Sequence, residues 1–439
     1  MRKLLCLLVI FCLLLPLMGA AERENALPEL LQMNQAFERR RHTNDRVTVI
    51  TLPHTACAAV DAEMEALLTA MADRAEEHLP PKAADANEGC ILDVGASVYR
   101  TGDRWMSFLS VATIRDGREQ IYADLDARAY DMSTGRRLTL ADVVAEEGLQ
   151  ALSAAAAEQL AAYFPQEAAD AETLAALTGV EALADVPFTL NTAYVQLHYR
   201  ADALYPGKNT LMHVRVSYGD LRPYLTEQAL IQTDNSARKL IALTYDDGPV
   251  RSRTLRLVRN LRAGGANATF FIVGDRIRVT HDELCLEHDA GFAIASHNYE
   301  HIYGAANKGK VIEYRDKLNG LLGAVTGSQV HIMRAPGGQE KIFIDEDVHL
   351  PLIHWSVISR SKNGVVANPE AEAKQLAAVA KDGDIILLHD MYSGTDRMAE
   401  TLPQLLAKKG FLCVTVEELF AARGVTLEPN QVYWDLRQE

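Results

Sequence analysis

From residue 239 onward, short apolar runs rich in β-branched and aromatic residues alternate with longer segments of helical composition. Continuous apolar strands that alternate with helices indicate a parallel sheet buried on both faces. The pattern therefore predicts the α/β class, and seven such units predict an open or incomplete barrel. The apolar runs lie at about 240–245, 268–273, 291–296, 330–334, 352–357, 384–389 and 411–416, and helical segments at 254–263, 308–325, 369–380 and 396–408.

The residues before this repeat belong to a different unit. A chain of 439 residues is too long for one ordinary core and predicts at least two domains. The polar, turn-forming stretch at 233–238 predicts a linker between them. In the region 40–230, a scaffold role and a carbohydrate-binding role are both open. Strands are predicted there at 47–50, 105–112 and 211–216, and helices at 64–78 and 149–163.

The first 20 residues have the pattern of a secretory signal peptide. Arg2 and Lys3 precede an apolar run at 4–17, and small residues at 18–21 offer a cleavage site. We therefore expect residues 1–20 to be removed and the protein to be secreted or attached to the cell surface. An uncleaved signal anchor is the alternative. No later stretch is long and apolar enough to span a bilayer.

Charge and cysteine content exclude several classes of partner. A formal net charge of -15 argues against nucleic acid and anionic surfaces, because both attract clustered Lys and Arg. The expected oligomeric state is a monomer. No cysteine lies in a metal-binding CxxC pattern, and spacing alone leaves disulfides and buried thiols equally open. The cysteines that remain after signal removal are Cys57, Cys90, Cys285 and Cys413.

Ionisable side chains follow the ends of several apolar runs. In parallel α/β folds, the loops that leave the carboxyl ends of the strands meet at one face, where active sites lie. We therefore expect side chains that are far apart in the sequence to meet in space. The residues at such positions are Asp246, Asp247, His297, His301, Arg334 and His389.

Two histidines give the clearest sign of a metal site. His297 and His301 are four positions apart, so on one helical turn their Cβ atoms would lie about 5–6 Å from each other. Zinc commonly takes three protein ligands and leaves one position for water, so a carboxylate would complete the set. Taken singly, each feature has a simpler explanation: the histidines as an exposed polar turn, 246–249 as a surface turn, and His389 as the cap of a buried strand.

Five motifs in this order resemble those of the polysaccharide deacetylase family, the NodB-homology domain of family four carbohydrate esterases. They lie at 244–249, 297–301, 334–338, around Trp355, and at 387–389. The similarity covers 239–424 and implies a distorted (β/α)7-type barrel. Segments 131–142 and 218–224 resemble a smaller α+β accessory domain that precedes some bacterial extracellular deacetylase domains, which places that domain at 40–230.

The resemblance also implies a metal ligand set and a set of substrate contacts. Asp247, His297 and His301 would hold a divalent ion, most often Zn²⁺, with Co²⁺ or another divalent ion as alternatives. The substrate-binding residues would be Pro336, Gly337, Trp355 and Leu387.

Three further residues receive catalytic roles from the same resemblance. Asp246 would be the general base, and Arg334 would pair with it and keep it ionised. His389 would be the general acid that protonates the departing amine.

The chain departs from the family pattern in its fourth motif. Ser361 and Lys362 stand where the family has a carboxylate followed by a tryptophan, and Ile358 precedes them. Loss of a nearby negative charge should lower the pKa of His389. Gly337 also replaces the usual aromatic residue of the third motif. We therefore expect an intact metal site and base, with a weakened acid and an unusual substrate pocket.

The combined expectation is an exported, metal-dependent enzyme that removes N-acetyl groups from a cell-wall glycan, with peptidoglycan as the first choice of substrate. Two alternatives remain open. One is a glycan-binding protein of the same fold that has lost turnover. The other is a hydrolase of acetyl esters such as those of xylan.

Overall fold

The computed structural model describes residues 27–34, 36–43, 46–80, 89–117, 119–302, 309–345 and 347–437. The expected signal peptide at 1–20 lies outside these ranges. Within them, no helix combines the length and apolar character that a bilayer crossing requires. Of the cysteines in this part of the chain, Cys57, Cys285 and Cys413 are free thiols, and Cys90 is buried in the core of the first sheet.

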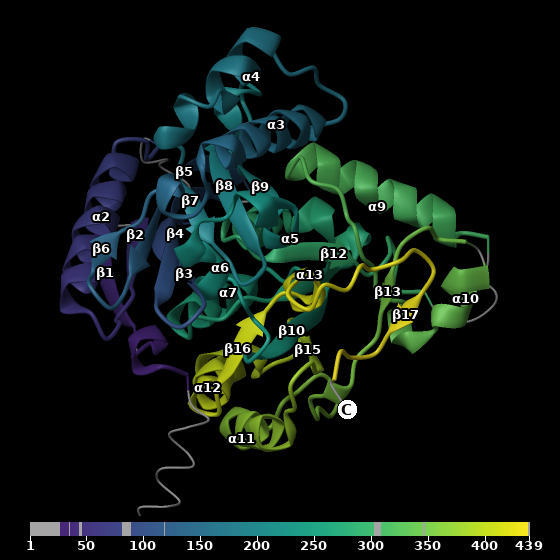
Figure 1. Cartoon of the computed structure of the whole chain (residues 1–439). Helices are drawn as coiled ribbons and strands as arrows, with labels where there is room; N and C mark the ends of the chain where they lie inside the picture. The colour runs from purple at the N-terminus through teal and green to yellow at the C-terminus, as the bar shows by residue number, and fades with distance from the viewer. Residues whose placement is uncertain are drawn as a thin grey trace, which may run out of the picture.

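The chain begins with a six-stranded sheet in the order β1-β2-β3-β4-β5-β6, covered by helix α2 (Figure 1). Neighbouring strands run antiparallel except β2 and β3, which are parallel. The predicted helix at 64–78 and the predicted strands at 47–50 and 105–112 are confirmed as parts of α2, β2 and β4. The bounds are β1 Phe37–Thr43, β2 Arg46–Leu52, α2 Ala58–Glu76, β3 Cys90–Thr101, β4 Trp105–Asp116, β5 Glu119–Asp131 and β6 Arg136–Arg137.

A three-stranded antiparallel sheet, β7-β8-β9, follows and packs with α3 around a second core. The predicted helix at 149–163 and strand at 211–216 correspond to α3 and β9. The expected linker at 233–238 is a turn that follows α6. The bounds are α3 Glu146–Ala162, α4 Ala171–Thr178, β7 Phe188–Leu190, β8 Tyr194–Arg200, β9 Leu211–Ser217, α5 Tyr218–Leu221 and α6 Glu227–Gln232.

The second half of the chain is a parallel sheet built around one long central strand, β10 (Lys239–Gly248). The strand order is β12-β11-β10-β15-β14, and β16 pairs with the first residues of β10. Helices pack their apolar faces against these strands in one core (Figure 1). The other bounds are α7 Thr254–Ala263, β11 Thr269–Ile272, α8 His281–Asp289, β12 Ala293–Ser296, α9 Val311–Val325, α10 Glu340–Asp345, β13 Leu352–Ile353, β14 Val357–Ile358, α11 Pro369–Val379, β15 Ile385–His389, α12 Thr395–Lys408, β16 Phe411–Val414, α13 Val416–Ala421 and β17 Val432–Tyr433.

Two of the predicted strands differ from expectation. The run at 330–334 forms no regular strand, and Met333 alone makes parallel bridges, to Ser296 and to Leu352. The chain then turns at Pro336, whose missing N–H ends any ladder. The run at 352–357 is divided into β13 and β14, which pair with β17 and β15 respectively. Met333 thus connects the end of β12 to β13 through single bridges in place of a regular strand. This irregular part of the sheet is the distortion expected of the barrel.

The two halves of the chain share a buried, charged junction. Asp93 of β3 accepts hydrogen bonds from Arg259, at 2.5 Å, and from Arg262, at 3.4 Å, both on α7. Arg115 of β4 donates to Asp282 of α8 at 3.2 Å. Because all five side chains are buried, the first sheet packs directly against the helices of the barrel.

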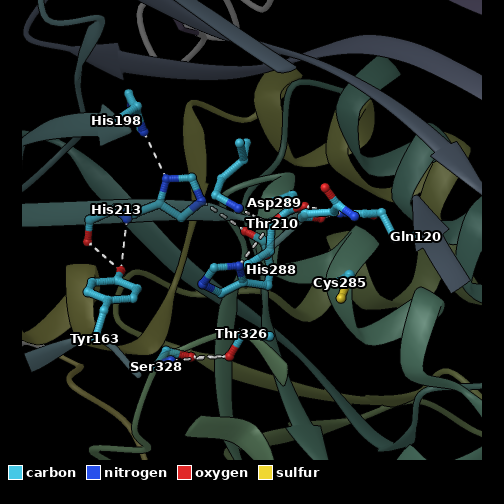
Figure 2. A network of polar contacts seen from close by, with 12 residues as sticks. Gln120, Tyr163, His198, Thr210, His213, Cys285, His288, Asp289, Thr326 and Ser328 are labelled. Atoms are coloured by element: carbon cyan, nitrogen blue, oxygen red, sulfur yellow. Dashed lines mark hydrogen bonds and ion pairs between the residues drawn. The ribbon is translucent and has the colours of Figure 1, made fainter. Parts of the chain in front are cut away.

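A second part of this junction is a chain of histidines, shown in Figure 2. The Nδ1 atoms of His198 and His213 are 2.9 Å apart, so one of them donates a hydrogen bond to the other. Nε2 of His213 lies 3.1 Å from the carbonyl oxygen of His288, at the end of α8. Burial lowers the pKa of His198 to about 3. Burial also lowers the pKa of His213, so His198 and His213 are held in their neutral form inside the folded protein.

Candidate metal centre and active site

The strand register brings the predicted residues to one end of the barrel. Asp246 of β10 lies directly beside His389 of β15 in the parallel ladder. His297 follows β12, and its backbone N–H donates to Ile272 of β11 at 2.8 Å. Arg334 follows the bridge at Met333, and its N–H donates to the carbonyl oxygen of Ser296 at 2.8 Å. The expected convergence of these side chains is therefore confirmed.

Asp247, His297 and His301 form a three-residue cluster whose ligand atoms all lie within 4.8 Å of one another. Oδ1 of Asp247 is 3.6 Å from Nε2 of His297 and 3.2 Å from Nε2 of His301. Asp247 and His297 are buried, whereas the side chain of His301 is 25% exposed. Solvent can therefore reach the cluster from the side of His301.

His297 is oriented for ligation by its second ring nitrogen. Nδ1 lies 2.9 Å from the carbonyl oxygen of Arg334, which accepts a hydrogen bond, so Nδ1 carries the proton. Nε2 is then unprotonated and faces Asp247. Burial lowers the pKa of His297, although the carboxylates of Asp246 and Asp247 oppose that shift. The neutral imidazole is the form that binds a metal.

The backbone between the two histidines is a loop and not the helical turn used to estimate their separation. Residues 297–301 have no helical assignment, and Asn298 adopts a φ of 67°. Asn tolerates this left-handed conformation better than most residues. The N–H of Asn298 is held by the hydroxyl of Ser296 at 3.1 Å. The two imidazole rings still meet, with centroids 5.0 Å apart, so the predicted contact is right and its predicted backbone is wrong.

The cluster fits a divalent cation. Oδ1 of Asp247 is buried and accepts no hydrogen bond within the described ranges, which is costly for a carboxylate unless a cation balances it. Two imidazole nitrogens and one carboxylate oxygen are a donor set that zinc uses in catalytic sites.

Asp246 is held beside this cluster by Arg334. Nη1 of Arg334 donates to Oδ1 of Asp246 at 2.7 Å and to the hydroxyl of Thr244 at 2.8 Å. Nε and Nη2 donate to the carbonyl oxygens of Ile353 and His354, at 3.1 and 2.9 Å. The other carboxylate oxygen of Asp246 lies 3.8 Å from Nε2 of His297. The guanidinium thus fixes one oxygen and leaves the other directed at the cluster.

His389 lies across from Asp246 at the end of β15. Its ring stacks on Tyr392, with centroids 4.3 Å apart and planes 15° from parallel. Burial lowers the pKa of His389, and the charges of Asp246 and Asp247 oppose this effect. The three residues of the divergent fourth motif, Ile358, Ser361 and Lys362, are exposed.

The predicted substrate contacts occupy different environments. Pro336 and Gly337 form a tight turn, in which Gly337 has a φ of 62°. Trp355 is partly buried, and its ring centroid is 5.8 Å from the guanidinium carbon of Arg334. Leu387 lies inside β15 and is only 3% exposed.

Three residues near the site were not identified from the sequence. Tyr392 could have been found from the sequence, because it lies three residues after His389, in the loop that leaves the carboxyl end of a predicted strand. His354 immediately precedes Trp355 and stacks on it with centroids 3.8 Å apart. Trp434 also contacts His354, with ring centroids 3.4 Å apart and planes 31° from parallel, and lies beyond the region of family resemblance.

Comparison with known proteins places this site in a family. The family described as polysaccharide deacetylase matches residues 233–349. A peptidoglycan-N-acetylglucosamine deacetylase of Listeria monocytogenes is 29% identical over 240 residues, which are 52% of this chain and 50% of the relative. The matched region therefore spans half the length of that relative.

Two further proteins are matched over most of their own length. A peptidoglycan-N-acetylglucosamine deacetylase of Bacillus cereus is 30% identical over 191 residues, which cover 41% of this chain and 88% of the relative. A solved structure of a family 4 acetyl xylan esterase from Clostridium thermocellum is 25% identical, with a TM-score of 0.42, and the match covers 45% of this chain and 99% of that one. The identity and coverage of the Bacillus cereus relative show that this chain belongs to the polysaccharide deacetylase family.

Proposed function

We propose that the protein hydrolyses N-acetyl groups of amino sugars in a cell-wall glycan, with peptidoglycan as the substrate, and releases acetate outside the cytoplasm. The observation that carries this proposal is the pairing of Asp247, His297 and His301 with an adjacent carboxylate, Asp246, that Arg334 holds in place. The family and the named activities of the relatives from Listeria and Bacillus support the substrate class.

Each residue of the site then has a defined task. A divalent ion held by Asp247, His297 and His301 would supply Lewis-acid chemistry. Asp246 accepts the proton of the attacking water, and Arg334 holds its carboxylate in place for this step. The oxygen of Asp246 that faces His297 is the one suited to this step, because Arg334 already occupies the other.

His389 donates the proton that the departing amine requires. It ends β15, the strand that pairs with β10 on the side away from β11 and β12. An amine is a poor leaving group unless it is protonated, so this step matters more for amides than for esters. A lowered pKa of His389 reduces the protonated fraction at neutral pH and so slows amide cleavage.

Acetate release from N-acetylglucosamine oligomers and from purified peptidoglycan, with zinc added, tests the proposal. We expect activity in the wild type and a loss of roughly 10²–10⁴-fold in Asp246→Asn. Asp316→Asn is the matched control, because Asp316 is an exposed carboxylate on α9. Absence of acetate from both substrates, in protein that binds zinc, would rule out this activity and leave glycan binding without turnover.

A second candidate function is hydrolysis of acetyl esters. The lowered pKa of His389 favours it, because an alkoxide leaving group needs less help from an acid than an amine does. Parallel assays on acetylated xylan and chitooligosaccharides separate the two. A higher kcat/KM on xylan would replace the amide proposal by the ester one.

A further inference from the structure

Trp434 is an exposed indole at the edge of the barrel. It directly follows β17 and is 53% exposed, although large apolar side chains are normally covered. The ring contacts the buried imidazole of His354, with centroids 3.4 Å apart and ring planes 31° from parallel. Nε2 of His354 is 2.9 Å from Oε1 of Glu340, so the imidazole that supports Trp434 is itself fixed.

The strand register puts Trp434 at the catalytic end of the barrel. β17 pairs with β13 in parallel, Leu352 with Val432 and Ile353 with Tyr433. The next residue of each strand is His354 and Trp434, and the N–H of His354 donates to Tyr433 at 2.7 Å. Because parallel strands share their direction, Trp434 leaves β17 on the side where the other strands present their catalytic residues.

A short series of contacts connects Trp434 to the catalytic base. His354 stacks on Trp355 and contacts Trp434, and the carbonyl oxygen of His354 accepts a hydrogen bond from Arg334 at 2.9 Å. Arg334 in turn binds Asp246. A single residue, His354, thus lies between Trp434 and Arg334, the arginine that orients the base.

The third motif, at 334–338, packs against the rings of His354 and Trp355. A Cβ on Gly338 would lie 3.1 Å from both the Trp355 ring and Nε2 of His354, so the turn at 336–338 packs tightly on these rings. The contacts hold the rings in fixed positions before any ligand arrives. A preorganised aromatic surface next to a catalytic site binds flat ligands with little loss of side-chain freedom.

We propose that the exposed face of Trp434 is a sugar-binding subsite that stacks on a pyranose ring of the glycan next to the one that reacts. This inference rests on the proposed deacetylase function and identifies the substrate as a chain of several sugars rather than a single one. An indole presents a large apolar face, which matches the C–H face of a pyranose, while sugar hydroxyls remain in water. The subsite therefore contributes to substrate affinity and not to the chemical step.

Kinetics on substrates of different length test the subsite. For Trp434→Ala we expect KM for N-acetylglucosamine tetramers to rise about three- to tenfold, which is the scale of one aromatic contact, with kcat unchanged. The dimer should show a smaller effect, and Trp434→Phe should keep most of the affinity. Phe37→Ala is the matched control, because Phe37 is an exposed aromatic side chain on the first sheet and is 60% exposed.

A binding measurement separates failure of the subsite from failure of the deacetylase proposal. The tryptophan fluorescence of Asp246→Asn is titrated with the tetramer, and the same titration is made with Trp434→Ala added. A saturable signal whose affinity Trp434→Ala weakens supports the subsite even if the wild type releases no acetate. Unchanged affinity in the doubly substituted protein, or an unchanged KM in Trp434→Ala, overturns the subsite and leaves the deacetylase proposal standing.

Discussion

Nη1 of Arg334 donates a 2.7 Å hydrogen bond to Oδ1 of Asp246, and both side chains are buried at the end of the barrel. The same guanidinium binds a hydroxyl and two backbone carbonyl oxygens, and its carbon lies 4.2 Å from the centroid of the Phe271 ring. This one side chain therefore joins β11 and the segment at 353–354 to β10, the strand that carries the proposed base.

Replacing Arg334 should damage stability and activity together. Arg334→Lys keeps a positive charge but cannot reproduce the planar set of donors. We expect a loss of about 1–3 kcal/mol in the free energy of unfolding for each of the two carbonyl oxygens, those of Ile353 and His354, that would be left buried without a donor. Urea unfolding measures it. Arg39→Lys, at an exposed ion pair with Glu65, should cost less than about 1 kcal/mol; equal losses at the two positions would refute the account of Arg334.

The metal site makes a prediction about ion affinity. Removing an imidazole ligand by His297→Ala should weaken zinc binding by roughly 100-fold or more, since loss of an outer contact alone typically costs 10–100-fold. Isothermal titration on protein stripped with a chelator measures this. The control is His349→Ala, because the side chain of His349 is 70% exposed and is not part of the cluster. Undiminished zinc affinity in His297→Ala would mean that zinc binds elsewhere.

The buried histidine chain predicts a dependence of stability on pH. The pKa of His198 is about 3 in the folded protein because of burial, against an ordinary value of 6.5. Between these values the unfolded chain binds a proton that the folded chain does not, so stability falls as the pH decreases below about 6.5. Each pH unit costs up to about 1.4 kcal/mol for this group.

Urea unfolding at several pH values between about 4 and 7 tests this dependence. In His198→Asn the slope of unfolding free energy against pH should be smaller, by up to the contribution of one bound proton, which is about 1.4 kcal/mol per pH unit. His349→Asn serves as the exposed control. An identical slope in wild type and His198→Asn would show that His198 does not titrate on unfolding in this range.

The charged junction predicts that the two halves of the chain unfold together. Asp93 is 1% exposed and is bound by Arg259 and Arg262 from the other half. Asp93→Asn leaves two buried guanidinium groups without their counter-charge, and we expect a loss of about 3–5 kcal/mol. Calorimetry should show one transition in the wild type. Two separate transitions, unaffected by Asp93→Asn, would mean that the halves are independent.

The sequence predicted the elements whose signals are local. The apolar runs of β10, β11, β12, β15 and β16 and the helices α7, α9, α11 and α12 follow from patterns that each segment carries by itself, whereas α8, between β11 and β12, was not predicted. The meeting of Asp246 with His389 also followed, because parallel strands place their carboxyl ends together. Direct contact between His297 and His301 was predicted correctly, although a loop with a left-handed Asn298 produces it.

What the sequence did not predict depends on contacts between distant segments. The run at 330–334 has strand-like composition, but within it only Met333 forms β-bridges. Arg334 directs its side chain to Asp246, and the chain turns directly afterwards at Pro336. β13 and β17 have two residues each, too few for any periodic pattern. The contact of Trp434 with His354 exists only because those two short strands pair, so neither residue was marked by its neighbours in the chain.

Crystals grown with zinc, measured for anomalous scattering at the zinc absorption edge, test the central claim most directly. The account predicts one strong peak, about 2.0–2.2 Å from Nε2 of His297, from Nε2 of His301 and from a carboxylate oxygen of Asp247, with Asp246 still bound to Arg334. A peak at another place, or no peak between these three residues in zinc-saturated crystals, would contradict it.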